Sequence, residues 1–291
     1  MPSFAEALAS GRFLVTAELT PPKGTDLSDL LRKAEMLRDW VDAFNLTDSA
    51  SAIMTMAPIA AASALKQRGI EPILQVTGRD RNRIALQADL LAASALGVTT
   101  VLCMGGDPPG SGDHPEAKPV FDLDTTSLLR AVAALDAGKD MMGHPLKGAA
   151  SLCAGAVANP GAADLDKELR RMEEKVAAGA RFFQTQAVYE VEPFREFMAR
   201  ASRFGAPVLA GFIVLKSGDM ARRLNAMLPG VSVPQALIDE LDGAADRAAK
   251  LVEIGGRIIA GLKEACQGVH VMAIGWEARI PDILRAAGIG H

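Results

Sequence analysis

The chain has 291 residues, 49% of them hydrophobic and 23% charged, which is enough for a large buried core and excludes a disordered or fibrous chain. Its 31 basic and 35 acidic side chains give a net charge of -4 without a basic block, so we expect no nucleic-acid partner. There is no signal-peptide pattern and no apolar stretch approaching about 18 residues, so we expect a cytoplasmic protein without membrane contact.

Short apolar runs rich in β-forming residues alternate with helical segments along the whole chain. The runs begin at Phe13, Ala43, Glu71, Thr99, Ser151, Phe182, Pro207 and Gly268. The first four starts are 30, 28 and 28 residues apart, about the length of one βα unit with its crossover helix. No linker or change of composition divides the sequence, so we predict one α/β domain over residues 1–291, a (βα)8 TIM barrel. An open doubly wound sheet is the alternative, although its glycine fingerprint is missing after the first run.

The segments between these runs include amphipathic helices of crossover length, predicted at residues 27–40, 82–97, 164–180 and 192–205. Two insertions interrupt the regular spacing. Residues 107–124 form a long loop rich in proline and glycine after the fourth run, and residues 217–265 hold extra helix before the last. Long loops in compact domains are often functional, so the loop after the fourth run is the first candidate for a binding element.

The C-terminal ends of barrel strands meet at one open mouth, where the following loops carry the reacting groups. The residues that this rule selects are mostly polar: Glu18, Thr47, Asp48, Gln75, Thr77, Gly105, Gly106, Asp107, Asn159, Thr185, Gln186 and Trp276. Buried strands are normally apolar, so this polarity indicates a small-molecule site.

Three of these residues have a specific chemical interpretation beside a structural one. A mouth carboxylate at Glu18 would have its charged form disfavoured by desolvation and could hold a proton as a general acid, or it is a solvated strand-end glutamate. Asp107 follows two glycines and could accept from ring nitrogens or merely stabilise the turn. Gln186 could donate and accept at once if it points inward, or it lies on the surface.

The segment from Gly78 to Arg83, GRDRNR, concentrates arginines beside a predicted helix start, which suits either phosphate binding or an ion-paired loop. The sequence has no Walker motif, no GxSxG and no HExxH, which argues against those nucleotide sites and hydrolases. The three cysteines and four histidines are scattered, so we expect no metal site and no disulfide framework.

Six motifs in register, each at a predicted strand end or its loop, carry a resemblance to a known family. They are AELTPPKGTD, NLTDS, QVTGRDRNRIALQADLL, MGGDPPGSGDHPEAKPVFDLD, ELRRMEEKVAAGARFFQTQAVYE and GVHVMAIGWE. In this order and over nearly the whole chain, they resemble the methylenetetrahydrofolate reductase family, in its form without a fused regulatory domain. The resemblance implies a flavin-holding barrel, with FAD or alternatively FMN, that passes hydride from NAD(P)H to 5,10-methylenetetrahydrofolate. The product would be 5-methyltetrahydrofolate, in one-carbon metabolism and methionine biosynthesis.

The resemblance also implies roles for individual residues. Glu18 matches the family's acid, Asp107 the carboxylate near pterin and flavin, and Gln186 the glutamine that contacts the pterin. Met220 and Trp276 would also bind the substrate. The residues implied for the cofactor are Thr47, Asp48, Gln75, Thr77, Gly105, Gly106, Asp107, Phe121, Ala156, Asn159, Glu168, Arg171 and Lys175. The last three share one face of a predicted helix.

Departures from the family pattern keep several alternatives open. Gln75 stands where many members carry histidine, Gly105 where many carry arginine, and Trp276 where some carry a substrate-binding arginine. FAD, FMN and a flavin-independent reductase therefore stay open, as do NADH and NADPH. A tetrahydrofolate-dependent methyltransferase and a non-catalytic subunit are the competing functions, and a homo-oligomer or a partner subunit is compatible with either.

Overall fold

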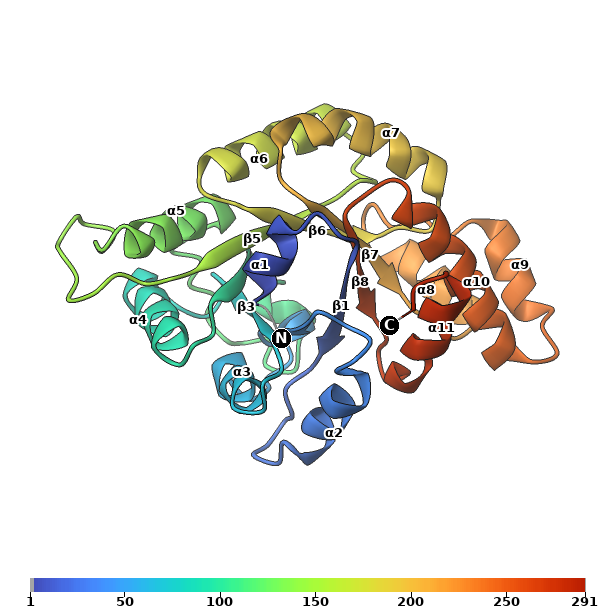
Figure 1. The fold of residues 1–291 in the computed structure, drawn as a ribbon, viewed down its shortest axis with the longest axis horizontal. Coiled ribbons are helices and arrows are strands. Elements are labelled where there is room, and N and C mark those ends of the chain that lie inside the picture. Colours follow the sequence, from blue (N-terminus) through green and yellow to red (C-terminus); the bar gives the residue numbers. More distant parts are fainter. Residues whose placement is uncertain (1–2, 291) are drawn as a thin grey trace.

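A computed structural model describes residues 3–290. Its strands are parallel and close into a barrel in chain order, with the last strand pairing back to the first (Figure 1). The strands are β1 (Leu14–Leu19), β2 (Ala43–Leu46), β3 (Pro72–Thr77), β4 (Thr100–Met104), β5 (Cys153–Ala158), β6 (Phe182–Ala187), β7 (Val208–Ile213) and β8 (Gly268–Met272). Each expected apolar run contains one of them. The predicted (βα)8 barrel is confirmed, and the alternative of an open sheet is wrong.

Helices surround the barrel (Figure 1). They are α1 (Phe4–Ala9), α2 (Ser28–Leu37), α3 (Pro58–Lys66), α4 (Arg83–Ala95), α5 (Thr125–Asp136), α6 (Leu165–Ala177), α7 (Val191–Ala201), α8 (Gly218–Met227), α9 (Gln235–Asp242), α10 (Arg247–Lys263) and α11 (Ile280–Ala286). Short 3-10 turns are η1 (Ala50–Ala52), η2 (Pro109–Ser111), η3 (Ser202–Phe204) and η4 (Glu277–Arg279). Side chains of Asn82, Asp124 and Asp164 accept from backbone N–H groups of the first turns of α4, α5 and α6, which fixes where these helices begin.

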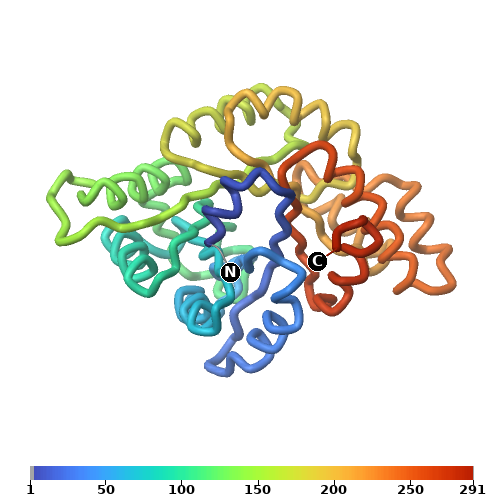
Figure 2. The backbone as a smooth tube through the Cα atoms, in the orientation of Figure 1, coloured from blue at the N-terminus to red at the C-terminus, as the bar shows by residue number. Residues whose placement is uncertain are grey.

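The barrel interior is apolar at its N-terminal end. The residues that fill it are Leu14, Ala43, Ile73, Leu102, Cys153, Phe182 and Leu209. Helix α1 closes this end, because Phe4 is fully buried with its ring centroid 5.3 Å from that of Phe182 in an edge-to-face contact. Figure 2 shows this N-terminal segment lying across the ring of strands. A ligand therefore reaches the interior from the opposite end only.

Alternate residues of each strand point outward and pack against the helices, which forms the larger hydrophobic layer. The insertion at residues 217–265 contains α8, α9 and α10, as its helical pattern predicts. The connection from α5 to β5 protrudes from the barrel at the left of Figure 1, around the single bridge between Lys139 and Pro145. In residues 3–290, every helix is too short or too polar to traverse a lipid bilayer.

Candidate active site

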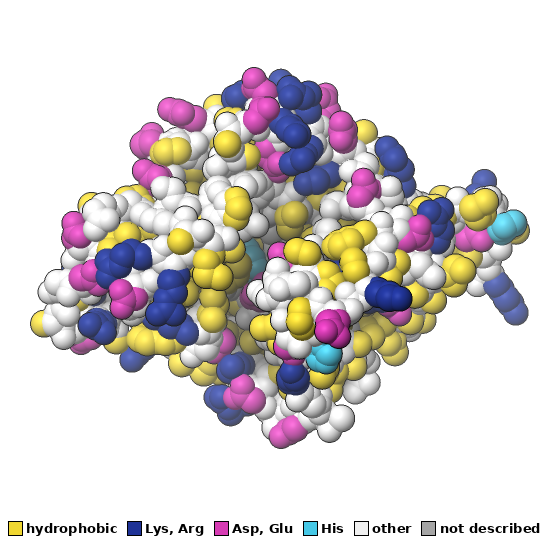
Figure 3. Space-filling model, turned by 180° about the vertical axis from the view of Figure 1, so that it is seen from behind, with side chains coloured by type: hydrophobic (Ala, Val, Ile, Leu, Met, Phe, Trp, Pro, Cys, Tyr) yellow, Lys and Arg dark blue, Asp and Glu magenta, His cyan; other side chains and the backbone are white. Residues whose placement is uncertain are grey.

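The C-terminal strand ends surround a cavity of about 320 Å³, which we call the mouth cavity. It opens on the face shown in Figure 3, where the molecular surface is hollowed at its centre. The residues that line it are Glu18, Gln75, Leu102, Met104, Gly105, Gly106, Asp107, Val157, Gln184, Thr185, Gln186, His270 and Met272. The structure thus brings Glu18, Asp107 and Gln186 to one cavity, although they come from β1, the loop after β4, and β6.

Glu18 is held by two neighbours that contact the same carboxylate oxygen. Gln75 Nε2 donates to Glu18 Oε2 at 3.1 Å, and His270 Nε2 lies 3.7 Å from that oxygen. The Glu18 side chain is 25% exposed, so it reaches the cavity while its base is enclosed. Within residues 3–290 the other oxygen, Oε1, accepts no hydrogen bond. The arrangement leaves Oε1 to meet a ligand.

A layer of buried polar side chains lies directly below Glu18 inside the barrel. Thr16 Oγ1 is 2.9 Å from His270 Nδ1, and Gln184 Nε2 donates to Thr16 Oγ1 at 3.2 Å. Asn45 and Gln184 exchange two amide hydrogen bonds of 2.7 and 3.0 Å. The sequence reasoning missed these four residues. A signal was present, because Thr16 and Glu18 alternate on one face of β1 and Gln184 and Gln186 on one face of β6.

Asp107 combines its two interpretations. Gly106 has a φ of +90°, and a Cβ atom there would come 3.1 Å from Thr77 Cβ, so the turn requires glycine. The Asp107 carboxylate accepts from Ser51 N at 3.2 Å, which connects the loop after β4 to the loop after β2. The side chain is exposed and lines the cavity, so the same carboxylate makes a loop contact and borders the cavity, and its role toward a ligand stays a prediction.

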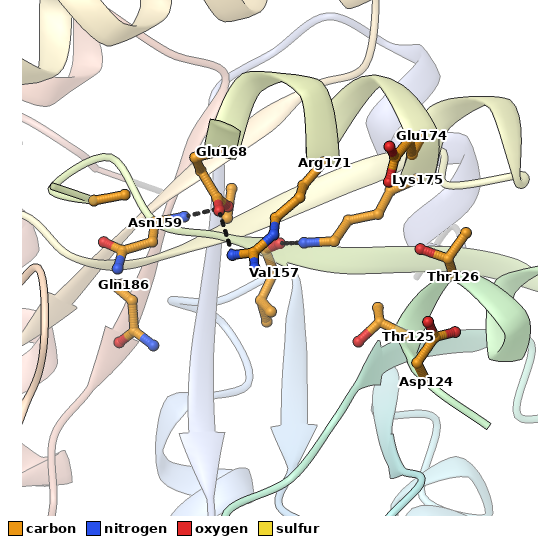
Figure 4. Close-up of a pocket in the computed structure, with 12 residues that line it drawn as sticks. Asp124, Thr125, Thr126, Val157, Asn159, Glu168, Arg171, Glu174, Lys175 and Gln186 are labelled. Carbon is orange, nitrogen blue, oxygen red and sulfur yellow. Dashed lines mark hydrogen bonds and ion pairs between the residues drawn. The ribbon is translucent and has the colours of Figure 1, made fainter. Parts of the chain in front are cut away.

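A second cavity of about 490 Å³ adjoins the first and shares Val157 and Gln186 with it. We call it the α6 cavity. Its lining comes from the strand end of β5, from α6 and from the start of α5 (Figure 4). The residues are Asp124, Thr125, Thr126, Val157, Ala158, Asn159, Ala162, Glu168, Arg171, Glu174, Lys175 and Gln186. The predicted face of Glu168, Arg171 and Lys175 therefore borders the site.

The charged groups of the α6 cavity are held in place by β5. Lys175 Nζ donates to the Val157 carbonyl at 2.7 Å, and burial lowers the pKa of Lys175. Glu168 is buried and accepts from Asn159 N at 3.0 Å, while its other oxygen lies 3.7 Å from Arg171 Nη1. These bonds make α6 and the end of β5 one unit, as the dashed lines of Figure 4 show.

The donors of the α6 cavity suit an anion. Lys175 and Arg171 supply positive charge, and across the cavity Thr125 and Thr126 form the first turn of α5, where backbone N–H groups favour negative charge. Three carboxylates also line the cavity: Asp124 accepts from Ser127 N at 2.7 Å, Glu168 accepts from Asn159 N, and Glu174 is exposed on α6. The joined cavities can accommodate an elongated ligand with a planar part in the mouth and anionic groups beside α6. A flavin nucleotide fits this donor set.

Thr47, Asp48 and Thr77 lie behind the wall of the mouth cavity. Asp48 Oδ2 accepts from Thr77 N at 2.8 Å and from Thr77 Oγ1 at 2.9 Å, and it also pairs with Arg81. Thr47 Oγ1 is buried, and within residues 3–290 it has no hydrogen-bond partner. A buried hydroxyl without a partner is costly, but this oxygen is enclosed and lies outside both cavity linings, so the cofactor role of Thr47 stays a prediction.

The arginines of the GRDRNR segment are paired with carboxylates. Arg79 binds Asp80, Arg81 binds Asp48 and Asp89, and Arg83 binds Asp122. Burial of the guanidinium at Arg79 is compensated by the Asp80 carboxylate, which raises the pKa of Arg79. The segment is an ion-paired loop that braces the mouth, and the phosphate interpretation is not supported.

The remaining predicted residues lie outside the linings of the two cavities. Phe121 is 44% exposed with a φ of +42°, in the loop after β4, and Ala156 is buried in the layer between strands and helices. Met220 of α8 and Trp276 after β8 are half-buried against the same layer. Their roles stay predictions.

In the described part of the chain, no group of three or more histidine, cysteine or acidic residues has the geometry to hold a metal ion. The three cysteines are buried as free thiols, and burial raises the pKa of Cys103 to about 12. A thiol so far from ionisation is a poor nucleophile. The carboxylates and amides of the mouth therefore carry the polar chemistry of this end.

The model of the methylenetetrahydrofolate reductase family matches residues 3–288. The chain belongs to the methylenetetrahydrofolate reductase family. It is 26% identical to methylenetetrahydrofolate reductase 2 of Schizosaccharomyces pombe over 98% of this chain and 47% of that protein. It is 25% identical to a probable methylenetetrahydrofolate reductase (NADPH) of Caenorhabditis elegans over 79% of this chain and 34% of that protein. The chain thus spans less than half the length of these two relatives.

A bacterial family member is closer in length. The 5,10-methylenetetrahydrofolate reductase of Pectobacterium carotovorum is 23% identical over 80% of this chain and 74% of that protein. Among solved structures, an uncharacterized protein from Clostridium thermocellum that binds two copies of 5-methyl-5,6,7,8-tetrahydrofolic acid has the same fold. Its TM-score is 0.69 at 18% identity, with 97% of both chains covered.

Proposed function

We propose that this reductase-family barrel transfers hydride from NAD(P)H, by way of bound FAD, to 5,10-methylenetetrahydrofolate and yields 5-methyltetrahydrofolate. One observation carries the proposal: Glu18, Asp107 and Gln186 line the same cavity. The names of the relatives and the folate bound by the Clostridium thermocellum protein support a folate substrate. The NADPH in the name of the Caenorhabditis elegans protein supports a pyridine-nucleotide donor.

Glu18 supplies the proton that the substrate needs. Opening the methylene bridge produces an iminium cation, and the departing nitrogen must take up a proton. Oε2 of Glu18 accepts from Gln75 Nε2, so Oε1 is the oxygen from which the proton would be delivered. Positioned general acids contribute about 100-fold to 10,000-fold to such steps.

Asp107 and Gln186 bind and stabilise the substrate. The Asp107 carboxylate lies at the same cavity and offsets the positive charge of the iminium, an electrostatic effect that is strongest where water is excluded. Gln186 carries one donor and one acceptor group on its amide, which matches the alternating donors and acceptors of a pterin edge. Because Gln186 also borders the α6 cavity, it lies where substrate and cofactor would meet.

FAD supplies the hydride-carrying ring when bound. Lys175, Arg171 and the first turn of α5 would hold its phosphate groups. FMN, which lacks the adenosine part of FAD, stays the alternative flavin. A flavin-independent reductase is the second candidate, because Gln75 and Gly105 replace residues that many members carry beside the flavin.

The test compares the two half-reactions in Glu18→Gln and in a surface control, Glu35→Gln, whose side chain is exposed on α2. We expect flavin reduction by NAD(P)H to stay within about twofold in both variants. We expect reoxidation by methylenetetrahydrofolate to slow by about 100-fold or more in Glu18→Gln only. Equal damage to both half-reactions would refute the acid role.

The same experiment separates the competing functions. A colourless, folded protein that oxidises NAD(P)H only with the folate would reject the flavin and keep the reductase. Folate binding without any NAD(P)H oxidation, with or without added FAD, would favour the methyltransferase or a non-catalytic subunit.

A further inference from the structure

An amide pair crosses the barrel interior below the mouth. Asn45 of β2 and Gln184 of β6 exchange two hydrogen bonds, although their strands are not neighbours in the barrel. Asn45 is 0% exposed and Gln184 is 2% exposed, although Gln184 borders the floor of the mouth cavity. Groups this deeply buried cost stability unless every donor and acceptor is used. The pair therefore needs a structural or functional reason to be there.

The pair determines how the Thr16 hydroxyl is oriented. One N–H of the Gln184 amide is used on Asn45 Oδ1, and the other points to Thr16 Oγ1 at 3.2 Å. Thr16 is fully buried and has one hydrogen to donate. Since its oxygen accepts from Gln184, that hydrogen goes to the remaining neighbour, His270 Nδ1, at 2.9 Å.

The orientation of Thr16 in turn selects the tautomer of His270. A ring nitrogen that accepts a hydrogen bond carries no proton, so in a neutral ring the proton lies on Nε2. His270 Nε2 is the atom that lies 3.7 Å from Glu18 Oε2, the oxygen that also accepts from Gln75. Two N–H groups then face Oε2, and Oε1 is left to carry the acidic proton.

We propose that Asn45 and Gln184 are positioning residues, which hold His270 in its Nε2–H tautomer and thereby assign the proton of Glu18 to Oε1. The tautomer of His270 is a property of the protein alone. The assignment of the Glu18 proton to Oε1 rests on the proposed function, because it matters only if Glu18 protonates a folate nitrogen. Three hydrogen bonds connect Asn45 on β2 to His270 on β8 by way of Gln184 and Thr16, and a 3.7 Å contact between His270 Nε2 and Glu18 Oε2 completes the path to the acid on β1.

The two amides could also be turned the other way round, which would give His270 the other tautomer. If both amides of the pair were turned over, Gln184 would present Oε1 to Thr16. The hydroxyl would then donate to Gln184, and His270 would carry its proton on Nδ1. Only one of the two arrangements places an N–H group toward Glu18.

The experiment is nitrogen-15 NMR of the protein labelled at histidine, at mildly alkaline pH, where an ordinary histidine is neutral. The His270 signals are assigned by their loss in His270→Asn, and the exposed His114 and His144 serve as internal references. We expect His270 to carry a proton on Nε2 and none on Nδ1. A proton on Nδ1, or a doubly protonated ring, would overturn the proposal without any test of activity.

A variant tests whether the amide pair is the cause. Gln184→Met removes both N–H donors at similar volume, and Thr100→Val is the control because it changes another buried polar side chain outside the network. In Gln184→Met we expect His270 to lose its single tautomer and the folate half-reaction to slow by about tenfold. Reduction of the flavin by NAD(P)H should stay within about twofold.

The outcomes separate the two proposals. An Nε2–H tautomer that persists in Gln184→Met would show that the pair does not set it and would overturn the inference. An Nε2–H tautomer in a protein with no folate reduction would uphold the tautomer assignment and reject the proposed function. If Gln184→Met does not fold, Asn45→Ser, which keeps a small polar side chain, gives the same readout.

Discussion

Lys175 gives the sharpest quantitative prediction for the α6 cavity. Its ammonium group is enclosed between α6 and β5, donates to the Val157 carbonyl at 2.7 Å and faces the start of α5. Replacing it with methionine keeps the apolar stem and removes the charge. A charge-assisted hydrogen bond contributes about 1.5–3 kcal/mol, and each 1.4 kcal/mol is about tenfold in affinity. Lys175→Met should therefore weaken FAD binding by about 10-fold to 100-fold.

The assay is an equilibrium titration of the apoprotein with FAD, followed by flavin fluorescence. Lys167→Met is the matched control, because Lys167 lies on the same helix but is exposed and outside the cavity. We expect its FAD affinity to equal that of the unchanged protein. The free energy of unfolding of Lys175→Met should change by only about 1 kcal/mol, since the lost hydrogen bond is offset by removal of a buried charge. Equal FAD affinity in the two variants would refute the placement of the phosphate groups.

Three further predictions follow from single contacts. Burial lowers the pKa of Lys175 from 10.5, so FAD affinity should fall as the pH rises toward 10.5 in the unchanged protein but not in Lys175→Met. The free energy of unfolding of the apoprotein should instead rise with pH, because the unfolded chain binds more protons than the folded chain in this window. Urea denaturation at several pH values would check the second effect. Phe4→Ala should lower the free energy of unfolding, measured by urea denaturation, by about 3–5 kcal/mol, and folate binding at the C-terminal end of the barrel should be retained. A loss below about 1 kcal/mol would contradict the inference that α1 closes the N-terminal end of the barrel. A Cβ atom at Gly112 would come 1.8 Å from the Ala52 carbonyl oxygen, so Gly112→Ala should separate the loops that Asp107 connects and raise the KM for the folate. Gly110→Ala is the control: a Cβ atom there meets nothing within 4 Å, and the KM should stay unchanged.

The architecture was predictable because its signals are local and repeated. Each strand is a short apolar run with turn residues beyond it, and the spacing of the first four runs matches one βα unit. The same regularity placed Glu18, Asp107 and Gln186 at one end, since the strand-end rule of barrels needs no knowledge of side-chain contacts. Their convergence on one cavity agrees with that rule.

The polar layer below Glu18 was not predictable in the same way. Asn45 and Gln184 are 139 residues apart, and their pairing depends on barrel closure and on which face of each strand is inside. A polar residue in the middle of one strand can equally face a loop or a neighbouring helix. Four such residues become a network only when Thr16 and His270, which are in register on β1 and β8, meet across the seam of the barrel.

The role of the GRDRNR segment could not be predicted from the sequence either. Its sequence is equally suited to binding phosphate and to ion pairing, because the partners of Arg81 and Arg83 come from outside the segment. Asp48 follows β2, Asp89 lies on α4 and Asp122 lies in the loop after β4. The groups that we propose bind the phosphates are on α6 instead, where the pattern of charges in the sequence is also typical of an ordinary solvated helix face.

The central claim is that one cavity at the strand ends holds the pterin against Glu18, Asp107 and Gln186. A crystal structure of the complex with 5-methyltetrahydrofolate tests it most directly. The account predicts the pterin ring in the mouth cavity, with Gln186 on its polar edge and Glu18 Oε1 directed toward the nitrogens. A folate bound with its ring elsewhere, and with these three side chains untouched, would contradict it.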